Sequence, residues 1–132
     1  MEIMFEVPGE LPPSKGEAKS MLADGHAQAA RVRRLLEEAS TAMAGREVLS
    51  GAIGLELLVS VPPRHPVADA TNMLGGVGDV LQARSTGADT THLGELADVA
   101  CYSDDNQIHE ITYKNLPAPT VGYRVRLWTL HA

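Results

Sequence analysis

Two short stretches of this chain carry carboxylates where a helix and a strand are expected to begin. The first, DATNMLGGVGD from Asp69 to Asp79, places polar side chains and glycines at helical spacing behind an N-cap residue. The second, YSDDNQI from Tyr102 to Ile108, places two adjacent carboxylates directly before a strand-like run. Carboxylates from separate elements are the ligands that a hard divalent cation takes. Together, the two stretches predict a metal site.

Each polar side chain in these stretches also has a purely structural interpretation. Asp69 can cap the helix that follows it, and the adjacent Asp104 and Asp105 are typical turn residues. Asn72 and Asp79 can serve as hydrogen-bond partners inside the protein. Taken singly, each residue fits the structural interpretation, whereas taken as a set they favour a site.

The glycines of the first stretch require an explanation of their own. Asn72 and Asp79 are seven residues apart and share a helix face, and Gly75 and Gly76 lie between them. Each glycine inside a helix costs roughly 1 kcal/mol relative to alanine. A helix that contains several of them is expected to have another backbone, or a ligand, packed closely against it.

Several other kinds of active site are absent from the sequence. The histidines show neither HExxH nor Cys-His spacing, which argues against a zinc site. No nucleophile elbow of the Gly-x-Ser-x-Gly type and no phosphate-binding loop is present. GGVGD lies inside a helical pattern and so is not a dinucleotide fingerprint. The few aromatic residues are too scattered for a base-stacking platform.

Length, charge and cysteine content indicate one small domain in a reducing compartment such as the cytoplasm. A chain of 132 residues is long enough for one core but not for two. Its net charge of −6 disfavours the binding of a polyanion over most of the surface. Nucleic acid could therefore bind only through local basic residues or through a metal ion. The single cysteine, Cys101, is expected to be a small buried side chain. Neither a signal peptide nor an apolar run of roughly 20 residues is present, so no membrane contact is expected.

The hydrophobic pattern predicts the elements that must position the site. Strands are expected at Ile3–Val7, Ile53–Val61, Asn106–Lys114 and Tyr123–Leu130. Helices are expected from Gly25 to Met43, capped by Asp24, and from Asp69 to Gln82. The last two strands are expected to pair as an antiparallel hairpin. The order predicts an α/β (α+β) fold: a single small domain with one mixed β-sheet and two main helices packed on it.

Two loops separate these elements. The first contains Pro12 and Pro13, which favour extended backbone, and two lysines, Lys15 and Lys19, that either promote solubility or contact phosphate. The second, residues 83–100, is a polar excursion with a short helical turn within HLGELADVA. A long polar loop in a small domain is often either mobile or functional, and its residues do not select between these alternatives.

The motifs occur in a distinctive order: PPS at Pro12–Ser14, a long helix, a strand, DATN and GDVL in the second helix, and finally YSDDNQIHEITYKN. Over nearly the whole chain, this order resembles the RusA family of Holliday-junction resolvases, the crossover junction endodeoxyribonucleases. The Asp-Asp-x-Gln segment before a strand is its most distinctive part. The resemblance implies a small homodimer that uses Mg²⁺, held by clustered aspartates, to cut branched DNA in recombination and repair.

The resemblance also implies roles for individual residues. The family's second helix begins Asp-x-Asp-Asn-x-x-Lys, and its first aspartate and its asparagine fall on Asp69 and Asn72. The implied catalytic and metal-binding residues are Asp69 and Asp105, with Asp104 as a further metal ligand. The residues implied to support this site are Thr71, Asn72 and Asp79. Lys15 and Lys19 are the residues proposed to contact DNA.

Three departures from the family pattern bear on activity. The motif's second aspartate falls on Thr71, its lysine falls on Gly75, and residues 83–100 look like an insertion. Loss of a carboxylate removes a negative charge next to the metal ion, and loss of the lysine removes a cation that could stabilise the phosphate. Two hypotheses follow: a divergent Mg²⁺-dependent endonuclease, or a catalytically inactive dimer that binds nucleic acid or a protein partner.

Overall fold

The computed structural model describes residues 1–16, 20–84 and 90–130. Four strands are present: β1 (Glu2–Pro8), β2 (Ile53–Val61), β3 (Ile108–Pro117) and β4 (Gly122–Thr129). The two main helices are α1 (Ala29–Met43) and α2 (Ala70–Leu81). Two short 3₁₀ helices, η1 (Thr91–Leu96) and η2 (Asp105–Gln107), follow α2.

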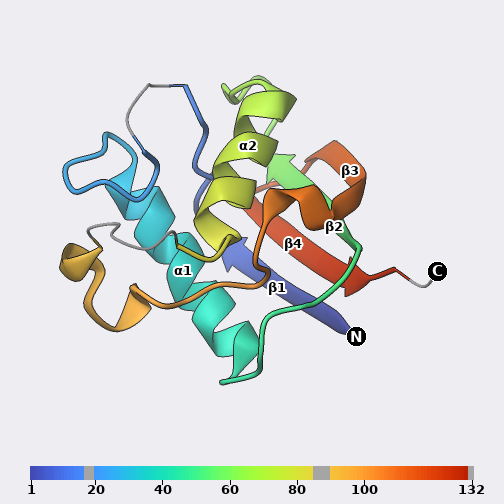
Figure 1. The fold of residues 1–132 in the computed structure, drawn as a ribbon. Helices are drawn as coiled ribbons and strands as arrows, with labels where there is room; N and C mark the ends of the chain where they lie inside the picture. Colours follow the sequence, from blue (N-terminus) through green and yellow to red (C-terminus); the bar gives the residue numbers. More distant parts are fainter. Residues whose placement is uncertain (17–19, 85–89, 131–132) are drawn as a thin grey trace.

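The strands form one mixed sheet in the order β1-β4-β2-β3. β4 runs antiparallel to both β1 and β2, whereas β2 and β3 are parallel. Both main helices lie over the same face of this sheet (Figure 1). The predicted α+β fold, a single small domain with one mixed sheet and two main helices, is therefore confirmed.

The predicted hairpin between the last two strands is wrong. β3 pairs in parallel with β2, and β4 lies on the other side of β2, between β2 and β1. The loop between β3 and β4 passes the end of β2, where the Ala118 N–H donates to the Val61 carbonyl at 2.9 Å. Burial explains the placement. The inward side chains of β4 are buried and require a central position, whereas no residue of β3 is fully buried and the strand suits an edge.

Helix α1 begins four residues later than the pattern predicts. Asp24 is not its cap, because the N-cap residue is Gln28. The reason is Gly25, which adopts φ +76, a left-handed conformation that cannot belong to a right-handed helix. The predicted end at Met43 is confirmed, and the chain leaves the helix through two left-handed residues, Ala44 and Gly45.

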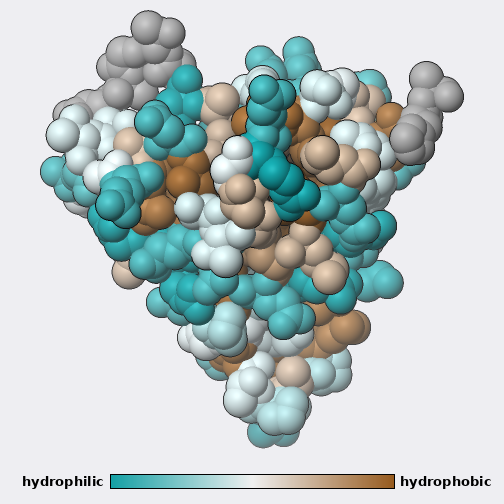
Figure 2. Space-filling model, turned by 90° about the horizontal axis from the view of Figure 1, so that it is seen from below, coloured by the Kyte–Doolittle hydropathy of each residue, from teal (hydrophilic) through white to brown (hydrophobic). Residues whose placement is uncertain are grey.

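The core lies between the helices and the sheet. The predicted apolar stripe of α1 is buried there and consists of Val32, Leu35, Leu36, Ala39 and Met43. The apolar residues of α2 are buried as well: Met73, Val77, Val80 and Leu81. Cys101 is also buried, as predicted, and burial raises the pKa of its thiol to about 12. On the face shown in Figure 2, hydrophilic side chains predominate, with hydrophobic ones between them. No helix within the described residues has the length and apolarity to cross a membrane.

Candidate functional site

The glycines of α2 make room for a second backbone. Residues Pro12–Lys15, which we call the PPSK segment, lie along the helix. The Lys15 N–H donates to the Asn72 carbonyl at 2.8 Å. A Cβ atom on Gly76 would overlap the Pro13 carbonyl oxygen, so the close approach is possible only at glycine. Of the two explanations left open by the sequence, the neighbouring backbone is confirmed.

The PPSK segment is fixed to the start of α1 by one glutamine side chain. The Ser14 N–H donates to Gln28 Oε1 at 2.7 Å, and Gln28 Nε2 donates back to the Ser14 carbonyl at 2.9 Å. Gln28 is itself held because its backbone N–H donates to Nδ1 of the buried His26 at 3.0 Å. The segment is therefore attached to both helices. No pattern in the sequence singles out Gln28, since a lone glutamine at a helix start has no characteristic spacing.

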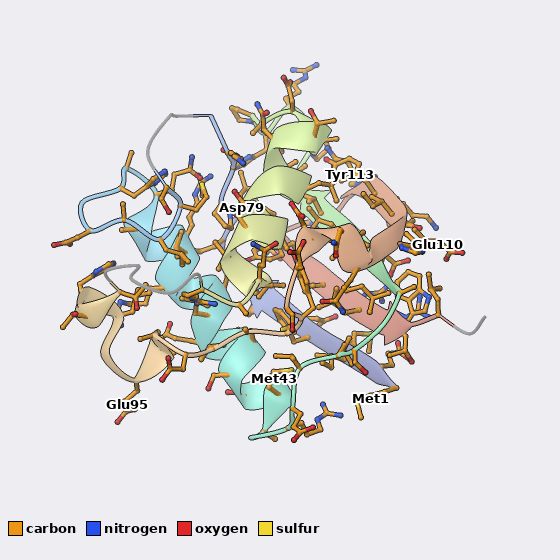
Figure 3. The ribbon with its side chains drawn as sticks, in the orientation of Figure 1. Met1, Met43, Asp79, Glu95, Glu110 and Tyr113 are labelled. Carbon is orange, nitrogen blue, oxygen red and sulfur yellow. The ribbon has the colours of Figure 1, made fainter. Side chains whose placement is uncertain are left out.

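The side chain of Lys15 extends from this segment to the C-terminal half of α2. Its Nζ lies 2.9 Å from Asp79 Oδ2, and its Cδ would be 3.5 Å from a Cβ on Gly75. The hydrogen bond to Asp79 and the charge of Asp79 raise the pKa of Lys15, with a smaller contribution from Asp105. The Lys15 side chain is 57% exposed and that of Asp79 is 35% exposed, so the ion pair is open to solvent. Asp79 projects from α2 in Figure 3.

Asp105 reaches the same region from the start of η2. Its backbone N–H donates at 2.7 Å to the side-chain oxygen of Gln82, the C-cap residue of α2. Beneath it, the buried Tyr102 donates its hydroxyl hydrogen to the Gly78 carbonyl. Burial raises the pKa of Tyr102, and the charges of Asp105 and then Asp79 raise it further. The structure thus pairs Lys15 with Asp79 and bonds the turn that carries Asp105 to Gln82, three residues after Asp79. We call Asp79, Asp105 and Lys15 the carboxylate–lysine cluster.

Asp104 has the structural role that its turn position allowed. Its carboxylate accepts the Asn106 N–H at 2.9 Å, and the Gln107 side chain accepts the Asp104 N–H at 3.0 Å. This reciprocal pair is a capping box, which fixes the start of η2. Gln107 Nε2 also donates to the carbonyls of Leu49 and Gly51. The Asp104 carboxylate therefore positions its neighbour Asp105.

Asp69 lies at the opposite end of α2 from this cluster. It is the N-cap residue, as predicted, but it is exposed and its side chain makes no capping hydrogen bond. Ten residues of helix separate it from Asp79, or about 15 Å at the usual rise per residue. Thr71 and Asn72 are exposed near the same end. The structure therefore does not bring the predicted pair Asp69 and Asp105 together.

The donor set of the cluster determines which ions it could hold. Among the described residues, no three His, Cys, Asp or Glu side chains are grouped so that they could hold a metal ion, so Asp69, Asp104 and Asp105 do not form a three-carboxylate site. Asp79 and Asp105 nevertheless supply two carboxylates. Mg²⁺ is commonly bound by one or two carboxylates, with water and substrate phosphate completing its octahedron. An ion on Asp79 would have to replace the Lys15 ammonium, which lies 2.9 Å from Asp79 Oδ2.

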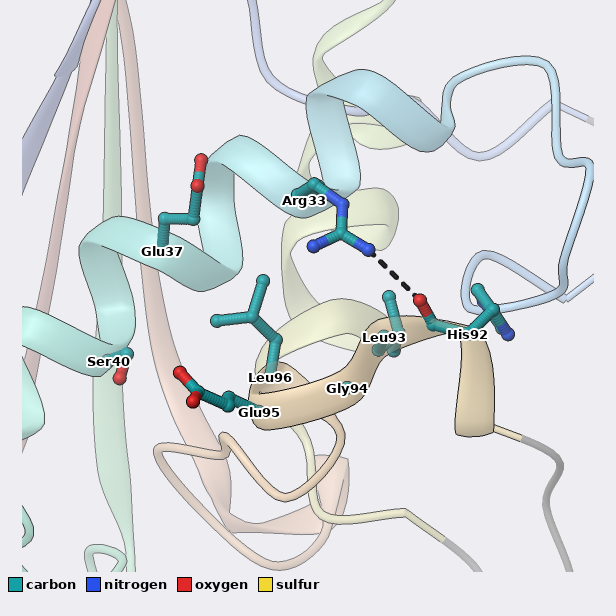
Figure 4. A pocket seen from close by; sticks show the side chains of 8 residues that line it. All are labelled: Arg33, Glu37, Ser40, His92, Leu93, Gly94, Glu95 and Leu96. Carbon is teal, nitrogen blue, oxygen red and sulfur yellow. Dashed lines mark hydrogen bonds between the residues drawn. The ribbon is translucent and has the colours of Figure 1, made fainter.

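The polar stretch after α2 is described at residues 83–84 and 90–100. It includes η1, which lies beside α1, where Arg33 Nη2 donates to the His92 carbonyl at 3.0 Å (Figure 4). An open cavity of about 550 Å³ lies between α1 and η1. Residues 85–89, and the predicted DNA contact Lys19, lie outside the described residues.

No protein-family model matches this chain, and no curated protein matches it significantly.

Proposed function

We propose that this protein is a RusA-like, Mg²⁺-dependent endonuclease that acts on branched DNA such as Holliday junctions in recombination or repair. The observation that supports the proposal is the exposed ion pair of Lys15 with Asp79 near the end of α2, where the η2 turn that carries Asp105 is bonded to Gln82. Carboxylates and a lysine on adjoining elements are residue types that suit a metal ion and a phosphodiester. The resemblance adds the expectation of a homodimer, and the single cysteine adds that of a cytoplasmic location.

The cost of admitting a metal ion is small. Exposed ion pairs contribute at most about 1 kcal/mol, and the pair of Lys15 with Asp79 is largely open to solvent. A divalent cation can therefore replace the ammonium at Asp79 without a large loss of stability. When bound, Mg²⁺ would lower the pKa of a water molecule and stabilise charge on the phosphate.

The chain's own residues then have distinct tasks. Asp79 and Asp105 would hold the cation from two elements, and Lys15 would provide a positive charge for a DNA phosphate. Tyr102 stays protonated at neutral pH, because burial raises its pKa, and its hydrogen bond to Gly78 fixes the turn before Asp105 to α2. Tyr102 is thus assigned a positioning role, with no part in proton transfer.

The second hypothesis is a catalytically inactive relative that binds nucleic acid or a protein without cleavage. One structural observation favours it. Lys15 neutralises Asp79 directly, which is how a carboxylate that has lost its metal can remain near a second carboxylate. The threonine at position 71 and the net charge of −6 point the same way.

A cleavage assay separates the two hypotheses. A labelled four-way junction and a linear duplex are incubated with the protein, with and without Mg²⁺ or Mn²⁺, and analysed for band shift and cleavage. We expect metal-dependent cutting of the junction that is lost in Asp79→Asn and Asp105→Asn and retained in Asp69→Asn. Junction binding without cutting would favour the inactive relative. Loss of cleavage in Asp69→Asn alone would place the metal at the other end of α2.

A further inference from the structure

β3 is an outer strand of the sheet, and one of its two edges is open. It pairs with β2 on one side, and no strand within the described residues pairs with its other side. No residue of β3 is fully buried, and the apolar side chains of Ile111 and Leu116 are 58% and 44% exposed. We infer that β3 pairs antiparallel with β3 of a second copy, with Thr112 at the two-fold axis, so that two sheets become one. The pairing needs neither a metal ion nor DNA, and so the inference goes beyond the proposed function.

Two charged residues of β3 lack a partner on the face of the sheet that the helices leave uncovered. Glu110 and Lys114 are exposed on this face, and Glu110 points away from the protein in Figure 3. On the inner strands of the same face, Arg124 pairs with Glu56 at 3.0 Å. Of the ion pairs between described residues, none includes Glu110 or Lys114. Four residues of strand separate the two, or about 13 Å, so they cannot reach each other within one chain.

Symmetry and charge together select one register for the pairing. In an antiparallel pair, side chains opposite each other lie on the same face, so a two-fold axis perpendicular to the sheet must pass through a residue. With Thr112 on the axis, Glu110 of each copy lies opposite Lys114 of the other, which gives two ion pairs. An axis through Ile111 or Tyr113 gives none. An axis through Glu110 or Lys114 places like charges opposite each other, which is destabilising.

The same register covers the exposed apolar side chains of β3. On the face that carries the helices, Ile111 of each copy lies opposite Tyr113 of the other, and Tyr113 already packs partly against the core. A pair of an aromatic and a β-branched side chain is favourable across two strands. Leu116 lies opposite Ile108 of the other copy. The backbone N–H and C=O groups along the open edge also gain partners.

The other edge strand, β1, is less suited to such a pairing. Its charged residues, Glu2 and Glu6, are both acidic, so no register places opposite charges across a pair of β1 strands. It also ends at Pro8, which has no N–H to donate to a neighbouring strand. The self-complementary charges are therefore a property of β3.

Sedimentation equilibrium of the whole protein over a range of concentrations tests the pairing. We expect a monomer–dimer equilibrium whose dissociation constant rises roughly tenfold or more in Glu110→Lys and in Lys114→Glu, because each variant places like charges opposite each other twice. Glu6→Lys, which makes the same change of charge on β1, should leave the dissociation constant unchanged. A protein that stays monomeric throughout, or equal dissociation constants in all these variants, would overturn the inference.

Two further measurements test the register itself. An equimolar mixture of Glu110→Lys and Lys114→Glu should associate more tightly than either variant alone, because each cross-strand pair then joins opposite charges. Thr112→Cys should be cross-linked by a short bismaleimide, whereas the two thiols of Glu110→Cys would lie about 13 Å apart along the strands. The natural Cys101 is buried, so the unchanged protein is the control. A mixture that associates no more tightly, or cross-linking of Glu110→Cys in preference to Thr112→Cys, would contradict the pairing.

The cleavage assay gives an independent result. A dimer that cuts no junction would keep the pairing and remove the proposed nuclease. A monomer that cuts junctions would keep the nuclease and overturn the pairing.

Discussion

The two ends of α2 carry similar carboxylates in different surroundings. At the N-terminal end, Asp69 is exposed and its side chain caps nothing. At the other end, Asp79 pairs with Lys15, and the side chain of Gln82, three residues later, accepts the Asp105 N–H. The difference comes from the segments that pack there, since the PPSK segment directs its lysine away from Asp69 and the η2 turn docks on the C-cap. Position in a motif therefore predicts the helix but not which of its ends meets other charged residues.

The largest expected effect comes from adding one methyl group beside the PPSK segment. Gly76→Ala should destabilise the protein by about 1–3 kcal/mol, because its Cβ would overlap the Pro13 carbonyl and the segment would have to move. Gly75→Ala is the matched control one residue away, where only the flexible Lys15 stem is near. It should be neutral or stabilising by up to about 1 kcal/mol through helix propensity. Urea unfolding of both variants measures the difference, and equal effects would contradict the packing.

The next effect tests the attachment of the same segment to α1. Gln28→Ala removes the side chain that satisfies the Ser14 N–H and carbonyl. Since unpaired, partly buried polar groups are costly, we expect a loss of about 1–3 kcal/mol and a weaker ion pair at Asp79. Thr41→Ala, on an exposed position of the same helix, should change stability by less than about 0.5 kcal/mol. A neutral Gln28→Ala would mean that the PPSK segment is held by α2 alone.

Much of the fold could be predicted because burial leaves a periodic signal. The alternation in β2 and the stripe of α1 gave their bounds within a few residues, and the glycines of α2 indicated a close neighbour. The position of β3 could not be predicted by simple pairing. Only the contrast between the buried inward residues of β4 and the exposed ones of β3 indicates which strand is central.

The candidate site could be predicted only in part, for a related reason. The two motifs single out Asp69, Asn72, Asp79, Asp104 and Asp105 as a set and do not rank Asp79 above Asp69, while Lys15 is expected either to promote solubility or to contact phosphate. The approach of Lys15 and of the Asp105 turn to the end of α2 that carries Asp79 depends on long-range hydrogen bonds to the side chains of Gln28 and Gln82, which have no local pattern. Asp69 was favoured by its place in the family motif, and motif position does not report which segments pack nearby.

The third prediction compares two aspartates that both precede helices. Asp104→Ala should lower the free energy of unfolding by about 0.5–2 kcal/mol, because its carboxylate accepts the Asn106 N–H, and Asp104→Asn should recover most of that. Asp69→Ala should have little effect, since that side chain makes no capping hydrogen bond. Chemical unfolding measures all three variants. A large loss in Asp69→Ala would show that the exposed end of α2 has a structural role.

The smallest expected effect is the most direct measure of the separation between the ends of α2. A double-mutant cycle of Lys15→Met with Asp79→Asn should give a coupling of less than about 1 kcal/mol at neutral pH, whereas the cycle with Asp69→Asn should give none.

The pKa of Lys15 is raised in the folded protein, so the ion pair of Lys15 with Asp79 stabilises the fold below the ordinary lysine value of 10.5. That contribution is lost as the pH rises through the higher folded-state pKa. Unfolding curves at pH 7 and above pH 11, and at low and high salt, should show the coupling disappear at high pH and weaken with salt. Coupling of Lys15 to Asp69 that equals its coupling to Asp79 would mean that the lysine serves both ends of the helix, and the cluster would then have to include Asp69.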